Sequence, residues 1–141
     1  MIKNNLSKEE LQQIVILDKE AHKEIKWWNL AKKSNLVKTN SIGLLFLIIY
    51  KKKNIGFIRY IFRKHYEDYP VEKSTIFLED LFISKKFRLK NLASESIFKS
   101  INLLRNKYKL SKVKLEAPLR LKDFYEKQGF EPNHIVMTKK L

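Results

Sequence analysis

The chain has 141 residues, 44% of them hydrophobic and 32% charged, which is enough for one compact domain spanning residues 1–141. It contains no cysteine, which excludes disulfide frameworks, thiolate metal sites and cysteine nucleophiles and favours a reducing, cytoplasmic location. Thirty Lys and Arg residues against 15 Asp and Glu residues give a net charge of +15. Such a charge attracts polyanions, although a lysine-rich solvated surface explains the same excess.

The chain shows no sign of a membrane or export segment. Its longest apolar stretch, residues 42–50, is about half as long as the ~20 residues that a membrane span requires. Glu9 and Glu10 stand where a signal peptide would have its hydrophobic core. We therefore expect neither export nor a membrane partner.

The first predicted element is a helix over residues 8–28. Ser7 and Glu10 form a capping box, and apolar residues with helical spacing follow from Leu11 to Trp28. Trp28 continues the apolar stripe, so we interpret Trp27 and Trp28 as core and rim aromatics rather than as a ligand-binding pair. Residues 32–40 are polar and are interpreted as a connection.

The next elements form a hairpin. Two apolar runs, residues 41–50 and 55–62, are separated by a basic tip of three lysines and an asparagine at 51–54. The runs are continuously apolar, which predicts strands covered on both faces. The lysines are interpreted as a solvated turn rather than as a binding patch, and residues 63–73 as a loop.

The second half of the chain alternates strands and helices. The predicted elements, in order, are a strand at 75–83, a helix at 92–108, a strand at 112–117, a helix at 119–128 capped by Gly129, and a strand at 134–138. A strand, helix and strand of these lengths predict a parallel pair. The fold class is therefore α/β, with a mixed β-sheet flanked by helices on both faces.

Two neighbouring acids lie inside the strand at 75–83. Alternation along the strand would place Glu79 on the face of Phe77 and Leu81, and Asp80 on the opposite face with Leu78 and Phe82. Burial there would raise either pKa toward the range of a general base. Pairing with a nearby lysine or a backbone cap is the alternative.

Two further segments carry candidate functional groups. A basic turn at 85–94 leads into a helix, whose free N–H groups make an anion site, although a solvated loop has the same composition. Tyr125 lies on the last helix, where half-buried packing is the ordinary role of a tyrosine. His22, His65 and His134 lack metal-ligand spacing, so no metal is expected.

Together these segments resemble the GNAT superfamily of acetyl-CoA-dependent N-acetyltransferases. The run from Phe77 to Ile83, the turn beginning at Arg88 and the run from Phe124 to Phe130 carry the resemblance over residues 41–138. Within the superfamily, the run from Leu78 to Ile83 is most similar to the spermidine/spermine and diamine N-acetyltransferases.

The resemblance implies direct transfer of an acetyl group from acetyl-CoA to a primary amine. Glu79 would accept a proton from the amine, Glu79 and Asp80 would bind the substrate, and Tyr125 would donate a proton to the departing thiolate. Backbone groups would hold and polarise the thioester, at Leu81, Phe82 and Ile83. The residues that would bind the pyrophosphate are Arg88, Leu89, Lys90, Asn91, Leu92, Ala93 and Ser94. Related enzymes are frequently dimers, so a homodimer is also expected.

Two positions depart from the family pattern. Asn91 stands where the pyrophosphate loop usually has glycine, and asparagine is the side chain that best tolerates positive φ. Pro118 stands where asparagine is common, which weakens the expected cofactor contact. A net charge of +15 also disfavours a polycationic acceptor at long range. The alternative function is an acetyltransferase-fold binding module for nucleic acid or a protein partner, with nucleic acid not favoured.

Overall fold

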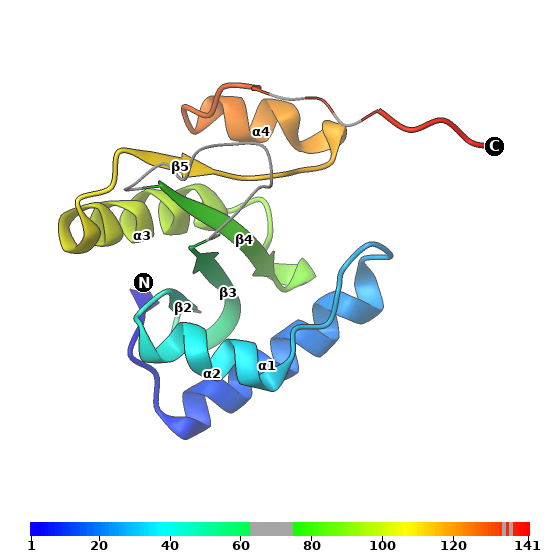
Figure 1. The fold of residues 1–141 in the computed structure, drawn as a ribbon. Coiled ribbons are helices and arrows are strands. Elements are labelled where there is room, and N and C mark those ends of the chain that lie inside the picture. Colours follow the sequence, from blue (N-terminus) through cyan, green and yellow to red (C-terminus); the bar gives the residue numbers. More distant parts are fainter. Residues whose placement is uncertain (63–74, 134, 136) are drawn as a thin grey trace.

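The computed structural model describes residues 1–62, 75–133, 135 and 137–141 (Figure 1). Its helices and strands, in chain order, are β1 (Ile2–Lys3), α1 (Lys8–Glu24), α2 (Lys33–Ser41), β2 (Leu45–Tyr50), β3 (Lys53–Ile61), β4 (Thr75–Ile83), α3 (Leu92–Tyr108), β5 (Lys112–Lys114) and α4 (Lys122–Lys127). Two short 3₁₀ turns, η1 (Lys85–Phe87) and η2 (Leu119–Leu121), precede α3 and α4. No helix in the described part of the chain is both long and apolar enough to cross a membrane.

The five strands form one mixed sheet in the order β1-β2-β3-β4-β5. The predicted hairpin is confirmed as the antiparallel pair β2 and β3, closed by Lys51 and Lys52 with φ values of 47° and 64°. Its bounds differ from the prediction, because β2 begins at Leu45 and β3 already includes residues 53 and 54 of the predicted tip. The predicted parallel pair is confirmed as β4 and β5. Helices α1 and α2 lie on one side of the sheet and α3 and α4 on the other, which confirms the predicted α/β class (Figure 1).

Each face of the sheet has its own apolar core. On the α1 side, Ile14, Ala21 and Trp28 pack with Phe57 and Phe82 of the sheet. On the α3 side, the largest buried side chains are those of Phe46, Tyr60 and Ile76, which pack with Ile97 and Leu104. The first four residues of β2, 45–48, are all buried, which confirms that this part of the strand is covered on both faces.

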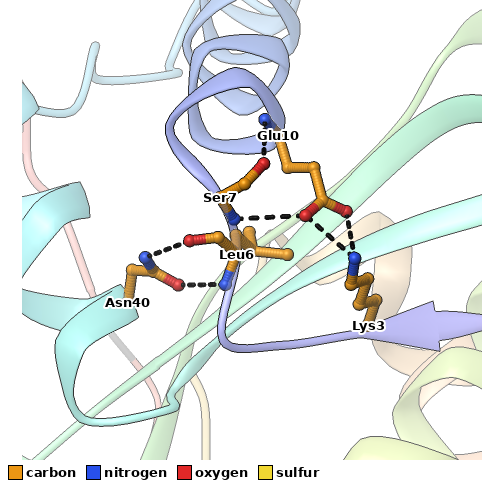
Figure 2. Close-up of polar contacts among 5 residues, drawn as sticks. All are labelled: Lys3, Leu6, Ser7, Glu10 and Asn40. Atoms are coloured by element: carbon orange, nitrogen blue, oxygen red, sulfur yellow. Dashed lines mark hydrogen bonds and ion pairs between the residues drawn. The ribbon is translucent and has the colours of Figure 1, made fainter.

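Polar contacts fix the start of α1 (Figure 2). The predicted capping box is confirmed, because Ser7 Oγ accepts the Glu10 N–H at 3.2 Å and Glu10 Oε1 accepts the Ser7 N–H at 3.1 Å. Lys3 pairs with the same carboxylate at 2.8 Å. The Asn40 side chain bonds both backbone groups of Leu6, at 2.9 and 3.1 Å, so it joins this segment to the end of α2.

Two predictions for the N-terminal half are wrong. Helix α1 ends at Glu24, because Ile25 leaves the helical region with φ −112° and ψ 112°. Residues 33–41 form helix α2 rather than a connection, since this polar segment buries Leu36 and Thr39 at a helical spacing of three. The assignment of the tryptophans to core and rim is confirmed, because Trp28 is 5% exposed and Trp27 is 51% exposed; both also line a cavity.

The C-terminal third differs from its prediction in length and type. Strand β5 ends at Lys114, and the predicted helix at 119–128 is divided into η2 and α4, followed by Gly129 with φ 89°. The strand predicted at 134–138 is absent among the described residues of that range. Ile135 and Met137 are exposed there, so their side chains do not contribute to the core. His134, Val136 and the predicted loop at 63–73 lie outside the described residues.

Candidate active site

A β-bulge in β4 determines where the two neighbouring acids lie. Arg59 of β3 is opposite Asp80, whereas the next residue, Tyr60, is opposite Leu78, so Glu79 is an extra residue in β4. Before the bulge Ile76 and Leu78 face the α3 core, and after it Leu81 and Ile83 do so. The simple alternation predicted from the sequence is therefore wrong across Glu79, because the extra residue shifts the pleat by one position.

The bulge gives the two acids different surroundings. Glu79 is exposed, so the prediction of burial is wrong for this residue. Asp80 is largely buried and forms an ion pair with Arg59, with Nε 2.6 Å from Oδ2. Burial raises the pKa of Asp80, the Arg59 guanidinium opposes that rise, and the charges of Glu79 and Asp18 add to it.

A cavity of about 430 Å³ opens beside these acids. Its walls come from the connection between α1 and α2, from β3 and β4, and from the segment after β5. The lining residues are Trp27, Trp28, Asn29, Leu30, Ala31, Lys32, Asn35, Arg59, Leu78, Glu79, Asp80 and Glu116. The cavity thus combines three carboxylates with tryptophan and two cationic side chains, which suits a ligand bearing positive charge.

A second hollow of about 420 Å³ lies between the N-terminus and the outer face of α3. Its polar side chains are those of Lys99, Asn102 and Asn106. These groups include no carboxylate or imidazole that could accept a proton near neutral pH. We therefore place the candidate active site at the acid-lined cavity.

Next to that cavity, β4 extends beyond its parallel partner. Strand β5 pairs with β4 only from Thr75 to Phe77, so residues 78–83 have no strand on that side among the described residues. The backbone groups of Leu81, Phe82 and Ile83 lie in this stretch, where an extended ligand can add to the edge of the strand. This is the part of the chain for which the resemblance to the GNAT superfamily implies thioester binding.

The turn between β4 and α3 is the segment for which the sequence predicts an anion site. Asn91 immediately precedes α3 with φ 57° and ψ 15°, so the positive φ expected at this position is confirmed. Leu89 also has positive φ, at 66°, and its side chain is exposed. Residues 81–94 contain no acidic side chain. The turn leads directly into the first N–H groups of the 17-residue helix α3, and Lys90 lies just before them in the chain.

Two side chains of this turn bond to α1. Arg88 donates from Nε to the Ile83 carbonyl at 2.8 Å, pairs with Glu24 and stacks over the Phe82 ring. Ser84 donates to Glu20 at 3.2 Å, one helical turn before Glu24. The structure therefore places the predicted phosphate ligand Arg88 between β4 and α1. Ser94 faces α4 instead, accepting a hydrogen bond from Gln128 Nε2 at 2.9 Å.

Tyr125 lies on α4 and is partly buried against the α3-side core. Its ring makes edge contacts with Phe124 and Phe130, at centroid distances of 4.9 and 5.8 Å. Burial raises the pKa of its phenol, so the hydroxyl keeps its proton at neutral and mildly alkaline pH. A phenol held in this form can act as a proton donor.

The sequence model of the acetyltransferase (GNAT) family matches residues 7–130. The chain belongs to the GNAT family. As a GNAT protein it is an acetyl-CoA-dependent N-acetyltransferase, with acetyl-CoA as co-substrate. Among curated proteins, no sequence match is found.

Solved structures show the same GNAT fold. Aminoglycoside N-acetyltransferase AAC(6')-Iy in complex with CoA is 17% identical with a TM-score of 0.73, covering 100% of this chain and 99% of its own. Glucosamine-6-phosphate N-acetyltransferase from Arabidopsis thaliana is 18% identical with a TM-score of 0.70, at 99% and 97% coverage. An aminoglycoside acetyltransferase from an uncultured soil metagenomic sample, in complex with sisomicin, is 16% identical with a TM-score of 0.69, at 100% and 94% coverage.

The residues of this GNAT chain suit acetyl-CoA. The edge of β4 at residues 81–83, which no described strand covers, can pair with an extended amide chain, and the acid-free turn at 84–94 offers N–H groups and Lys90 to phosphates. Among the described residues, no group of three His, Asp or Glu side chains is arranged to hold a metal ion. The strand edge and the turn together offer groups that suit an extended amide chain carrying phosphates.

Sequence reasoning did not identify two residues of the site. Arg59 interrupts an apolar run between Ile58 and Tyr60, and Asp18 interrupts the apolar stripe of α1 between Leu17 and Ala21. Each of these charged residues stands out in the sequence, because a charged side chain within an apolar face needs a partner of opposite charge or a hydrogen bond. The partners themselves depend on tertiary structure, Asp80 for Arg59 and Trp28 for Asp18.

Proposed function

We propose that this GNAT protein acetylates a primary amine of a small acceptor that carries more than one ammonium group, of the diamine or polyamine type. The observation that carries the proposal is the convergence of Glu79, Asp80 and Glu116 on one cavity beside the free edge of β4. The net charge of +15 repels cations at long range, but exposed charges are screened beyond a Debye length of about 8 Å. Inside the cavity, three carboxylates face the two cationic side chains of Arg59 and Lys32, which leaves a net negative charge.

We assign the two acids of the bulge to different tasks. Only the neutral amine is a nucleophile, so an acceptor that enters as ammonium must lose a proton. Glu79 is exposed at the cavity, where its carboxylate takes that proton through water and passes it to solvent. Asp80, fixed by Arg59 at 2.6 Å, binds and orients an ammonium group.

The co-substrate side of the proposal uses the backbone of β4 and the turn before α3. Acetyl-CoA supplies an acetyl group activated as a thioester. Backbone groups of Leu81, Phe82 and Ile83 hold the extended arm and polarise the carbonyl, and Tyr125 holds the proton that the departing sulfur takes up. The pyrophosphate ligands are the N–H groups of residues 89–94, with Lys90 and Arg88 adding positive charge.

The test is thiol release from acetyl-CoA in the presence of a panel of amines. The panel contains a diamine, a monoamine of equal chain length, an aminosugar and a lysine peptide. We expect release with the diamine at the highest kcat/KM, and binding of acetyl-CoA by calorimetry without any amine. No release with any amine refutes the proposed function. Salt-dependent RNA binding without acetyl-CoA binding would favour the binding-module alternative.

A further inference from the structure

Asp18 is a buried carboxylate that the proposed chemistry does not use. It lies in the middle of α1 and is 2% exposed, among the apolar residues that pack α1 on the sheet. An ionised carboxylate at such a depth requires hydrogen-bond donors to offset its lost hydration. Both of its oxygens have one.

The two donors come from the connection between α1 and α2. Trp28 Nε1 donates to Oδ1 at 2.8 Å, and the Ala31 N–H donates to Oδ2 at 2.9 Å. One turn further along α1, His22 Nδ1 bonds the carbonyl of Trp28 at 2.8 Å. Residues 25–32 contain no helix or strand, so these bonds hold a segment that has no backbone ladder of its own.

The held segment is one wall of the acid-lined cavity. Trp28 and Ala31 both line it, opposite Asp80 and Arg59. The Trp28 ring also makes edge contacts with Phe57 and Phe82, at centroid distances of 6.1 and 5.9 Å, which seat the wall on β3 and β4. Without Asp18 the indole N–H would be buried without an acceptor, which costs free energy and disfavours this position of the ring.

We propose that Asp18 is a positioning residue for the acceptor site, which fixes the wall formed by Trp28 and Ala31 and thereby sets the affinity for the acceptor amine. The inference rests on the proposed function, because it takes this cavity as the acceptor site. Asp18 does not touch the reacting atoms. Its loss therefore affects the binding of the acceptor and leaves the chemical step and acetyl-CoA binding intact.

Two variants weaken the hydrogen bonding between Asp18 and this wall from opposite sides. Asp18→Asn keeps the shape but loses one of two acceptors, and Trp28→Phe keeps an aromatic wall without the N–H. Ile14→Val is the matched control, since it trims a buried side chain of the same helix face that does not line the cavity. Should Asp18→Asn fail to fold, Asp18→Glu carries the test, because Trp28 itself lines the cavity and its substitution also alters direct contact with the acceptor.

The measurements are KM and kcat for the diamine, the Kd of diamine and acetyl-CoA by calorimetry, and hydrogen exchange of the Trp28 indole with exposed Trp27 as internal reference. We expect acceptor KM and Kd to rise about tenfold in both variants, as for a lost hydrogen bond to a charged group. We expect kcat and the acetyl-CoA Kd to stay within about twofold of wild type, and indole exchange to accelerate in Asp18→Asn.

Unchanged diamine affinity in a folded variant whose Trp28 indole exchanges faster overturns the inference. So does a parallel loss of acetyl-CoA and diamine affinity, because that is general destabilisation. A wild-type protein that binds the diamine but releases no thiol refutes the proposed function only, and the calorimetric comparison then decides this inference. A wild-type protein that binds no amine overturns both.

Discussion

Arg59 and Asp80 form an ion pair across the interrupted register of β3 and β4, with Nε 2.6 Å from Oδ2 and both side chains less than one-fifth exposed. Burial alone would favour the protonated form of Asp80, and the guanidinium favours the carboxylate. The pair therefore holds the Asp80 carboxyl group in a fixed orientation at the wall of the cavity. Its sequence neighbour Glu79 is exposed, so two adjacent carboxylates have unlike surroundings and can serve unlike roles.

Substitution of these acids should separate proton transfer from substrate binding. Glu79→Gln is expected to lower kcat by about 10²-fold or more, the usual contribution of a general base, with acceptor KM little changed. Asp80→Asn is expected to raise acceptor KM instead. Steady-state kinetics with thiol detection measure both. A Glu79→Gln protein with wild-type kcat contradicts the assignment, and a large loss of kcat in Asp80→Asn alone would show that the roles are reversed.

The pH dependence of acceptor binding should report Asp80. Because its pKa is raised, this carboxylate gains its proton at a higher pH than an ordinary aspartate, and it then no longer attracts an ammonium group. We expect acceptor Kd to weaken as pH falls through that raised pKa, and to lose this dependence in Asp80→Asn. Calorimetric titrations over the acidic range test this. An identical pH dependence in wild type and variant would count against the role of Asp80.

Tyr125→Phe should lower kcat without unfolding the protein. The ring contacts with Phe124 and Phe130 remain, but the proton donor is gone, so kcat falls by about 10²-fold. Tyr108→Phe is the matched control, because its hydroxyl bonds the Ile42 carbonyl at the other end of α3. We expect near wild-type kcat in the control. Equal rates in both variants would exclude Tyr125 as the donor.

Asn91 should tolerate glycine and not alanine. At φ 57° alanine costs about 1 kcal/mol, whereas glycine adopts this conformation freely. Asn91→Ala is expected to weaken acetyl-CoA binding by calorimetry, and Asn91→Gly to preserve it. Lys109 has φ 52° at the opposite end of α3, so Lys109→Gly should raise the free energy of unfolding without changing acetyl-CoA affinity. Equal acetyl-CoA affinity in the two Asn91 variants would show that the backbone conformation of this turn does not matter for phosphate binding.

Gly56→Ala should disturb the co-substrate strand. A Cβ at Gly56 would lie 2.1 Å from the Phe82 carbonyl oxygen and 3.0 Å from Ile83 Cα, so β3 and β4 must move apart where β4 is proposed to hold the thioester. We expect a loss of about 2 kcal/mol or more in urea unfolding, together with weaker acetyl-CoA binding. At Gly129 an added Cβ would meet no neighbouring atom, but φ is 89°. Gly129→Ala should therefore lower the free energy of unfolding without changing acetyl-CoA affinity. Intact acetyl-CoA affinity in Gly56→Ala would contradict the placement.

Local signals made part of this fold predictable. Ser7 and Glu10 satisfy each other's backbone groups within three residues, and the bounds of β4 and α3 follow from their own apolar patterns. Helix α2 could not be found this way, because its two buried residues, Leu36 and Thr39, acquire their partners only in the folded sheet. The bulge at Glu79 depends on register with β3, which alternation within one strand cannot reveal. The cavity wall at Trp28 depends on Asp18, ten residues earlier.

The most direct test of the account compares two acceptors in one assay. Initial rates of thiol release from acetyl-CoA are measured with a diamine and with the monoamine of equal chain length, at physiological ionic strength. Because Asp80 and Glu116 lie beside Glu79 in the cavity, the second ammonium group should raise kcat/KM by about tenfold, the equivalent of ~1.4 kcal/mol. Equal kcat/KM values for the two amines, or no thiol release with either, would contradict the proposal that this cavity selects a multiply charged amine.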